Sequence, residues 1–213
     1  EDDARPPVKR DAWYYYSRTE KGKAYPIYCR KHGSLDAAEQ VFFDQNAAAA
    51  AHEYYQLGGM EVSPDHRYVA LLVDTSGYEE FTLRVLEVAT GTWLPDAIAK
   101  LSFGLAWASD SQTVFYLTTD AAKRANQVWR HALGSAREAD ASVYRDDDVL
   151  FNVGVGRSRS GRWIYVTSGS FTSGETWLVD AAAPATPPVL VRARRPGVEY
   201  EVSAAGDWLY VYT

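Results

Sequence analysis

Several stretches of the sequence resemble motifs around which enzymes place reactive groups. A serine hydrolase needs the nucleophile elbow Gly-x-Ser-x-Gly, because that strained turn exposes the serine at the top of a sheet. No such string occurs, and the Ser-Gly pairs at residues 160–161 and 173–174 are typical of hairpin turns. His52-Glu53 begins like the helix of a zinc protease, but Gln56 stands where the second histidine must be. His52 is therefore interpreted as a surface or interdomain histidine.

Two glycine-rich stretches and one further histidine also lack the partners that a site would need. Residues 169–176 imitate a phosphate-binding loop, but Glu175 occupies the position of the required lysine, and a carboxylate repels phosphate. Residues 154–156 lack the third glycine of a dinucleotide-binding loop. His131 follows Trp129 in a strand pattern and is interpreted as a packed strand histidine rather than a ligand. We therefore predict no catalytic residue, no cofactor site and no metal site in this chain.

Two charged runs remain as candidates for interaction with a partner. Asp146, Asp147 and Asp148 could attract basic peptides, although charge runs in loops are usually only solvated, and both interpretations stay open. The basic stretch at residues 192–195 is interpreted as a loop charge cluster that could contact another domain. The candidate site therefore consists of three carboxylates whose expected role is substrate attraction.

The elements that would position these residues are short strands arranged as a repeat. Aromatic residues make up 14% of the chain and stand in runs with β-branched residues, a pattern typical of strands. Four such runs each follow a polar turn, and equivalent anchors in these turns are spaced by 45, 50 and 45 residues, at Asp65, Asp110, Ser160 and Ala205. A period of roughly 40–50 residues with about four short strands is typical of a β-propeller blade.

The repeat predicts an all-β fold, a partial β-propeller with about four four-stranded blades of roughly seven, propellers in general having about 4–8. We treat residues 1–213 as one truncated propeller domain, and its expected blades are residues 8–56, 57–100, 101–150 and 151–195, followed by the start of another at 196–213. One short connector helix is predicted between the first two blades. It begins with Asn46 as N-cap and continues through an alanine-rich stretch to Tyr55.

The second repeat unit allows its strands to be placed individually. We expect them near residues 59–62, 68–74, 81–87 and 92–94. The chain stops at Thr213 inside what reads as a strand, so we expect it to be a piece of a longer protein. An arc of four blades has two unclosed ends, and open apolar edges recruit other chains. We therefore expect the segment to self-associate edge to edge.

Composition argues against several classes of partner. The formal net charge of −6 disfavours nucleic acid, and the lack of a cluster of five or more Lys or Arg residues disfavours an anionic membrane surface. No apolar run is long enough for a transmembrane helix, and the opening residues do not form a secretion signal. Cys29 is the single cysteine, which permits no internal disulfide, and we expect a cytoplasmic protein.

A set of short strings carries a more specific resemblance, spread from about residue 6 to residue 213. The most specific string is Val128-Trp129-Arg130-His131-Ala132-Leu133-Gly134, and the loosest stretch is 180–197. The other strings lie at residues 10–18, 25–30, 44–46, 52–55, 62–65 and 74–79. On these residues the chain resembles the N-terminal propeller of the oligopeptidase B (protease II) branch of the prolyl oligopeptidase family of serine peptidases.

The resemblance implies a two-domain enzyme in which an α/β-hydrolase domain, absent from this chain, carries the Ser-Asp-His triad. It implies cleavage of short peptides after Lys or Arg, with the propeller restricting substrate size and bracing the catalytic domain. The expected partners are that hydrolase domain and short basic peptides, and the segment alone should be inactive. The alternative is a free-standing propeller that serves as a protein-interaction scaffold, because one fold hosts both. A downstream Gly-x-Ser-x-Gly elbow followed by Asp and His would decide for the peptidase.

Overall fold

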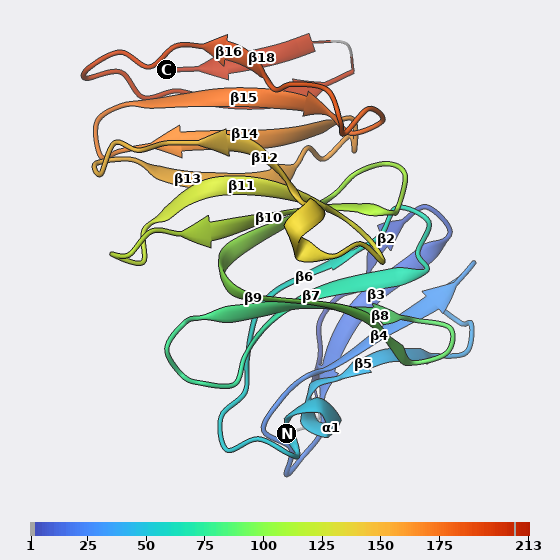
Figure 1. The fold of residues 1–213 in the computed structure, drawn as a ribbon. Helices are drawn as coiled ribbons and strands as arrows, with labels where there is room; N and C mark the ends of the chain where they lie inside the picture. The colour runs from blue at the N-terminus through green and yellow to red at the C-terminus, as the bar shows by residue number, and fades with distance from the viewer. Residues whose placement is uncertain (1–2, 207) are drawn as a thin grey trace.

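The computed structural model describes residues 3–206 and 208–213, which form a succession of antiparallel sheets (Figure 1). In the first sheet β4 lies between β3 and β5, and both β1 and β2 pair with β3. Its strands are β1 (Asp3–Ala4), β2 (Val8–Arg10), β3 (Trp13–Thr19), β4 (Ile27–His32) and β5 (Gln40–Asp44).

The second sheet has seven strands because one long strand takes part in two sets of pairings. Strand β9 has 16 residues; its first part pairs with β8 and its last part with β10. Leu101 is in register with both Phe81 and Thr118 and marks the change of partner. The strands are β6 (Gln56–Val62), β7 (Tyr68–Asp74), β8 (Phe81–Glu87), β9 (Thr92–Trp107), β10 (Thr113–Thr119), β11 (Ala125–Ala132) and β12 (Ala141–Arg145).

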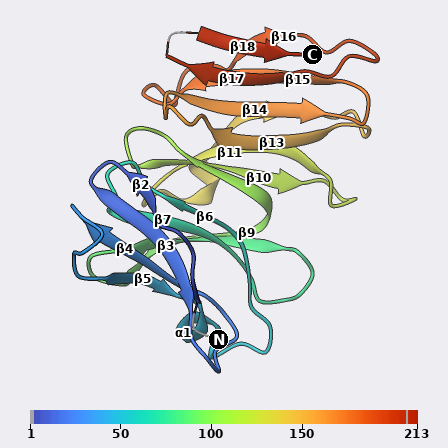
Figure 2. The ribbon, with the colours of Figure 1, turned by 180° about the vertical axis from the view of Figure 1, so that it is seen from behind.

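The third sheet and a final strand pair complete the described chain. The sheet consists of β13 (Asn152–Arg157), β14 (Trp163–Gly169), β15 (Gly174–Asp180) and β16 (Val189–Arg192), and the pair of β17 (Glu201–Ala205) and β18 (Trp208–Tyr212). Figures 1 and 2 show the sheets following one another in chain order, with the two ends of the chain at opposite ends of the stack. The predicted all-β fold is confirmed, and the blade limits stay a prediction. β9 runs without a break through residues 100–101, where two of the expected blades meet.

Two of the strands placed from the sequence, 68–74 and 81–87, coincide with β7 and β8. The connector helix also lies where it was expected, but its bounds were wrong: α1 spans Gln45–Ala49. Asp44 is the N-cap, and its side chain accepts a hydrogen bond from the Asn46 backbone at 2.9 Å. The side chain of Asn46 instead contacts the backbone of Tyr25: its Oδ1 accepts from the Tyr25 N–H at 2.9 Å, and its Nδ2 donates to the Tyr25 carbonyl at 2.8 Å. Within the described residues, no helix is long and apolar enough to cross a membrane.

The repeated polar turns work through one recurring hydrogen bond. The hydroxyl of Ser63 accepts from the backbone N–H of Tyr68 at 2.9 Å, and that of Ser158 accepts from the backbone N–H of Trp163 at 3.0 Å. Each serine therefore closes a turn of six residues and fixes where the following strand begins. Asp110 does similar work in the intervening unit by accepting from the N–H groups at 112 and 113, both at 2.9 Å.

The strands bury their side chains in three apolar clusters. One lies inside the seven-stranded sheet and includes Phe81, Trp107 and Tyr116. A second joins that sheet to β13–β15, and a third joins it to the first sheet and α1. The three larger sheets therefore share cores with their neighbours, which fixes the relative positions of the loops that connect them.

Candidate functional site

The acidic run lies in the loop between β12 and β13, and the structure separates its three members. The Asp146 side chain is only 5% exposed, whereas Asp147 and Asp148 are exposed to solvent. A buried carboxylate requires partners, because removing an unpaired charge from water is costly. The run is therefore one structural carboxylate followed by two that face solvent.

Asp146 is held by groups from three other elements. Its Oδ2 accepts hydrogen bonds from the hydroxyl of Ser168 on β14 and from Nη1 of Arg194, both at 2.6 Å. The hydroxyl of Tyr144 on β12 donates to the same oxygen at 3.3 Å and to Glu175 on β15 at 2.9 Å. The acidic and basic runs seen in the sequence thus meet in an ion pair that bridges neighbouring sheets.

The electrostatics of this cluster follow from burial and pairing. Burial alone raises the pKa of Asp146, but hydrogen bonds from Ser168 and Arg194 outweigh it and hold that pKa below its usual value. Burial lowers the pKa of Arg194, and the contact with Asp146 more than reverses that effect. Burial, followed by the hydrogen bond to Glu175, raises the pKa of Tyr144, so its phenol stays neutral. The cluster is a compensated pair rather than a free negative patch.

Arg124 fixes the backbone of the same loop. Its Nη1 donates to the carbonyls of Asp146 at 3.2 Å and Phe151 at 2.5 Å, and its Nε pairs with Asp120 at 2.9 Å. The guanidinium of Arg194 lies 3.8 Å from the centre of the Phe151 ring. Both ends of the loop are therefore anchored, and its tip is presented in a defined position.

The tip itself carries two carboxylates and two apolar side chains. Asp147 pairs with Arg145 at 2.6 Å, although both side chains are more than half exposed. Asp148 caps the turn by accepting from the backbone of Leu150 at 3.1 Å. Val149 is 76% exposed and Leu150 is 71% exposed. This tip can offer a partner a limited negative field and a small apolar contact, because two of the three charges already have cationic neighbours.

The other residues singled out from the sequence lie apart from this loop. Ser160 and Gly161 lie in the turn between β13 and β14. Ser173 lies in the turn between β14 and β15, whereas Gly174 is the first residue of β15. His52 is exposed beyond α1. His131 is 1% exposed, with Nδ1 2.7 Å from Asp140 and Nε2 2.9 Å from Asp96. Its interpretation as a packed histidine is confirmed. In the part of the chain that the structure describes, no group of three or more His, Cys, Asp or Glu side chains is arranged to hold a metal ion.

Sequence reasoning did not find the residues that hold the acidic loop. Arg124 and Ser168 belong to no motif, and Arg194 was recognised only as part of a basic run. Arg194 and Asp146 are separated by 48 residues, so no local spacing links them. The only available signal was that an acidic run and a basic run both fall in predicted loops.

The model of the prolyl oligopeptidase N-terminal β-propeller domain matches residues 1–213. The chain belongs to this family. The relation covers the full described fold and confirms the predicted partial propeller.

Two of the curated relatives match almost the whole chain. Dipeptidyl aminopeptidase BI of Pseudoxanthomonas mexicana is 35% identical and Protease 2 of Moraxella lacunata is 33% identical, each over 97% of this chain. The chain spans 31% of the length of each of these relatives. It is thus similar to about a third of the length of two family members that are named as peptidases.

Solved structures agree with the sequence relatives. Oligopeptidase B from Leishmania major superimposes with a TM-score of 0.92 at 29% identity, and oligopeptidase B from Trypanosoma brucei, with covalently bound antipain in a closed form, with a TM-score of 0.90 at 32% identity. Each match covers 99% of this chain and 30% of the other. The resemblance to the oligopeptidase B branch noted in the sequence is confirmed.

Proposed function

We propose that this chain is the non-catalytic propeller segment of a serine oligopeptidase that cleaves short peptides after Lys or Arg. The observation that carries the proposal is the similarity to two oligopeptidase B structures across 99% of the chain. The resemblance implies that the Ser-Asp-His triad belongs to an α/β-hydrolase domain packed against the propeller. The propeller then contributes by limiting the size of substrates and by bracing that domain.

The acidic loop adds weak attraction for basic peptides in this proposal. Asp147 and Asp148 are exposed, whereas Asp146 is occupied by Arg194 and cannot serve. Exposed charges act over about 10 Å at 0.1 M salt, so their contribution is to capture and falls with ionic strength. The preference for Lys or Arg at the cleaved bond belongs to carboxylates outside this chain, because a desolvated cation needs an anion in contact.

The test uses the protein at its full natural length and matched fluorogenic peptides with Arg, Lys or Pro before the cleaved bond. We expect kcat/KM to be high for peptides with Arg or Lys before the cleaved bond and low for those with Pro. We also expect kcat/KM to fall as the peptide becomes longer and to be lowest for folded proteins. The double variant Asp147→Asn, Asp148→Asn should lower kcat/KM for basic peptides by less than about threefold, and only at low salt. Preference for Pro would overturn the proposed branch, and loss of the Arg preference in the double variant would show that the propeller reads that residue directly.

A second candidate activity is the removal of dipeptides from peptide N-termini. The observation that favours it is the 35% identity to a relative named as a dipeptidyl aminopeptidase. The two activities are separated by the same peptide with a free and an acetylated N-terminus. Cleavage of the acetylated peptide supports the endopeptidase, and strict dependence on the free amine supports release of dipeptides.

The chain alone is proposed to be inactive and to reside in the cytoplasm. Cys29 is buried, and burial, as the largest effect, raises its pKa to about 11, so its thiol is a poor nucleophile at neutral pH. Purified residues 1–213 should hydrolyse ester and amide reporters at the rate of the blank. Activity that disappears on substitution of a residue in this chain, or recovery of the natural protein outside the cytoplasmic fraction, would contradict these statements.

A further inference from the structure

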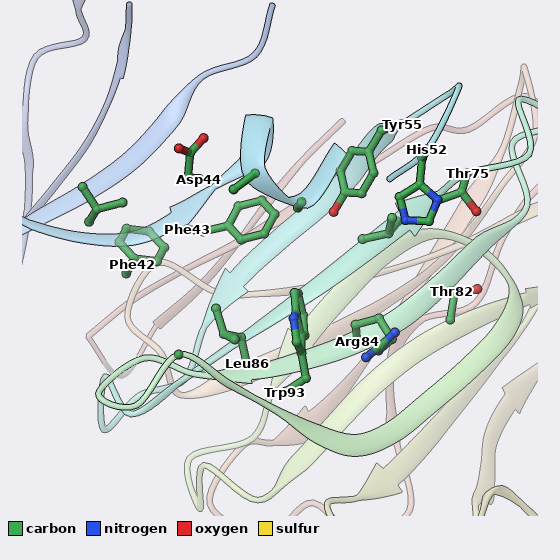
Figure 3. A pocket seen from close by; sticks show the side chains of 15 residues that line it. Phe42, Phe43, Asp44, His52, Tyr55, Thr75, Thr82, Arg84, Leu86 and Trp93 are labelled. Atoms are coloured by element: carbon green, nitrogen blue, oxygen red, sulfur yellow. The ribbon is translucent and has the colours of Figure 1, made fainter. Parts of the chain in front are cut away.

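A pocket of about 570 Å³ lies between the first sheet and the seven-stranded sheet (Figure 3). One side is formed by β5, α1 and the segment that follows the helix, and the other by β8 and the start of β9. Trp93 is 37% exposed and His52 is exposed, so the pocket opens to solvent at these residues. The volume falls within the range of small-molecule sites, about 300–1,000 Å³.

The pocket has aromatic walls held in place by the core. Phe43 and Tyr55 are 4% and 6% exposed, and Leu86 on the opposite side is 5% exposed. The rings of Phe43 and Trp93 meet edge to face, with centroids 6.4 Å apart. The two rings contact each other and so form one rigid aromatic wall, against which an apolar or aromatic group can pack.

Arg84 on β8 is the unusual member of the lining. Thr82, Arg84 and Leu86 alternate along the strand and therefore share the face turned to the pocket, as Figure 3 shows. The Arg84 guanidinium lies 5.0 Å from the centre of the Trp93 ring. Its Nε is buried and has no hydrogen-bond partner among the described residues. A buried donor without an acceptor costs about 1–3 kcal/mol, and more when it is charged.

The surroundings leave the charge of Arg84 uncompensated. Asp44 lines the pocket, but its carboxylate accepts from the backbone and side chain of Asn46 and pairs with Lys23 at 3.7 Å. Burial raises the pKa of Tyr55 to about 12, against a smaller lowering effect of Arg84, so Tyr55 stays a neutral phenol. The pocket thus combines a net positive group with apolar walls and polar neutral hydroxyls at Thr75 and Thr82.

We propose that this pocket binds a small monocarboxylate with an aromatic or branched apolar body. The carboxylate accepts from the two Nη groups of Arg84, one of the two-bond geometries that a guanidinium favours. The apolar body packs against the wall that Phe43 and Trp93 form together. The same chemistry is offered by a free acid and by the C-terminal residue of a short peptide.

The test is calorimetric titration of the protein at its full natural length with N-acetylphenylalanine and with N-acetylphenylalanine amide, which lacks the negative charge. We expect the acid to bind at least tenfold more tightly than the amide. Arg84→Gln should remove this difference, and Arg84→Lys should restore part of it. Trp93→Leu should weaken both ligands and keep the preference for the acid. The matched control Arg67→Gln, on an arginine outside the pocket, should leave both affinities unchanged.

The wild-type comparison of acid and amide keeps the proposal falsifiable even where Arg84→Gln does not fold. Equal affinity for acid and amide, or no heat up to 10 mM of either ligand, would overturn it, and so would a folded Arg84→Gln protein that keeps the preference. A tetrapeptide ending in Phe and its C-terminal amide then distinguish the two sources. Tight binding of the free tetrapeptide supports peptide C-termini as ligands, and binding of the free acid alone supports a small metabolite-sized carboxylate.

Discussion

Asp146 and Arg194 lie 48 residues apart in the sequence and form an ion pair of 2.6 Å that joins the loop after β12 to the loop after β16. Asp146 is 5% exposed and Arg194 is 31% exposed at the side chain. The pair therefore has one desolvated and one partly solvated member. Its role is to fix the position of one sheet relative to its neighbour at a point where their loops meet.

We predict that Arg194→Gln destabilises the chain by about 1–3 kcal/mol, because it leaves the buried carboxylate of Asp146 with only neutral side-chain donors. This loss of unfolding free energy is smaller than for a fully buried ion pair, because Arg194 is partly exposed. Urea unfolding followed by tryptophan fluorescence measures the change. Arg195→Gln, at an exposed neighbour, is the control and should change stability by less than about 0.5 kcal/mol. Equal effects of the two substitutions would contradict the structural role of Asp146.

The pH dependence of stability should also report on Asp146. Its pKa is lowered in the folded chain, so the unfolded chain binds more protons between the folded value and about 3.9. The stabilisation is therefore complete above that range and is lost as pH falls through the folded pKa. We expect Asp146→Asn to be less stable than wild type at pH 6, with the gap narrowing toward pH 3. A constant gap across this range, measured by urea unfolding at each pH, would count against the assignment, and Asp147→Asn at an exposed site provides the control.

A glycine in β6 provides a test of the core between strands. An added Cβ at Gly58 would lie 2.3 Å from the ring of Phe81, which is fully buried. The ring cannot move aside without disturbing its cluster, so Gly58→Ala should destabilise by about 1–3 kcal/mol. Gly156→Ala in β13, where an added Cβ meets nothing within 4 Å, is the matched control and should be near neutral. Thermal unfolding of the two variants would show a lowered Tm for the first alone.

Local sequence signals were sufficient to place strands that lie between polar turns and whose residues either alternate between buried and exposed or are buried on both faces. β7 and β8 were placed correctly for that reason, and Ser63 and Asp74 mark the two ends of β7. β9 was predicted far too short: a strand was expected near residues 92–94, and it runs from Thr92 to Trp107. Pro95 and Gly104, residue types that are uncommon inside strands, both lie within it. The structure accommodates Gly104 at φ 118°, next to the change of pairing partner.

The candidate site was less accessible to sequence reasoning than the fold. The three carboxylates at 146–148 look equivalent in the sequence, and only the three-dimensional position of Arg194 separates the first from the others. Arg84 likewise looks like an ordinary arginine in an alternating strand. Its lack of an acceptor depends on how α1 and β5 pack over β8, which is a non-local property. Pairing and desolvation, rather than residue type, decide what these groups do.

The final prediction concerns the last strand. β18 pairs only with β17 among the described strands, and its side chains are exposed on both faces, from 41% for Leu209 to 73% for Trp208. An apolar strand with one open edge recruits other chains, so residues 1–213 should self-associate at concentrations near 100 μM, about the level at which exposed edges are problematic in vitro. The double variant Tyr210→Lys, Tyr212→Lys places charge on this edge and should shift the sedimentation profile toward monomer. Phe171→Lys, at a fully exposed hairpin tip, is the control and should leave association unchanged. A strictly monomeric wild-type chain at this concentration would contradict the prediction, and equal effects of the two variants would place the contact elsewhere.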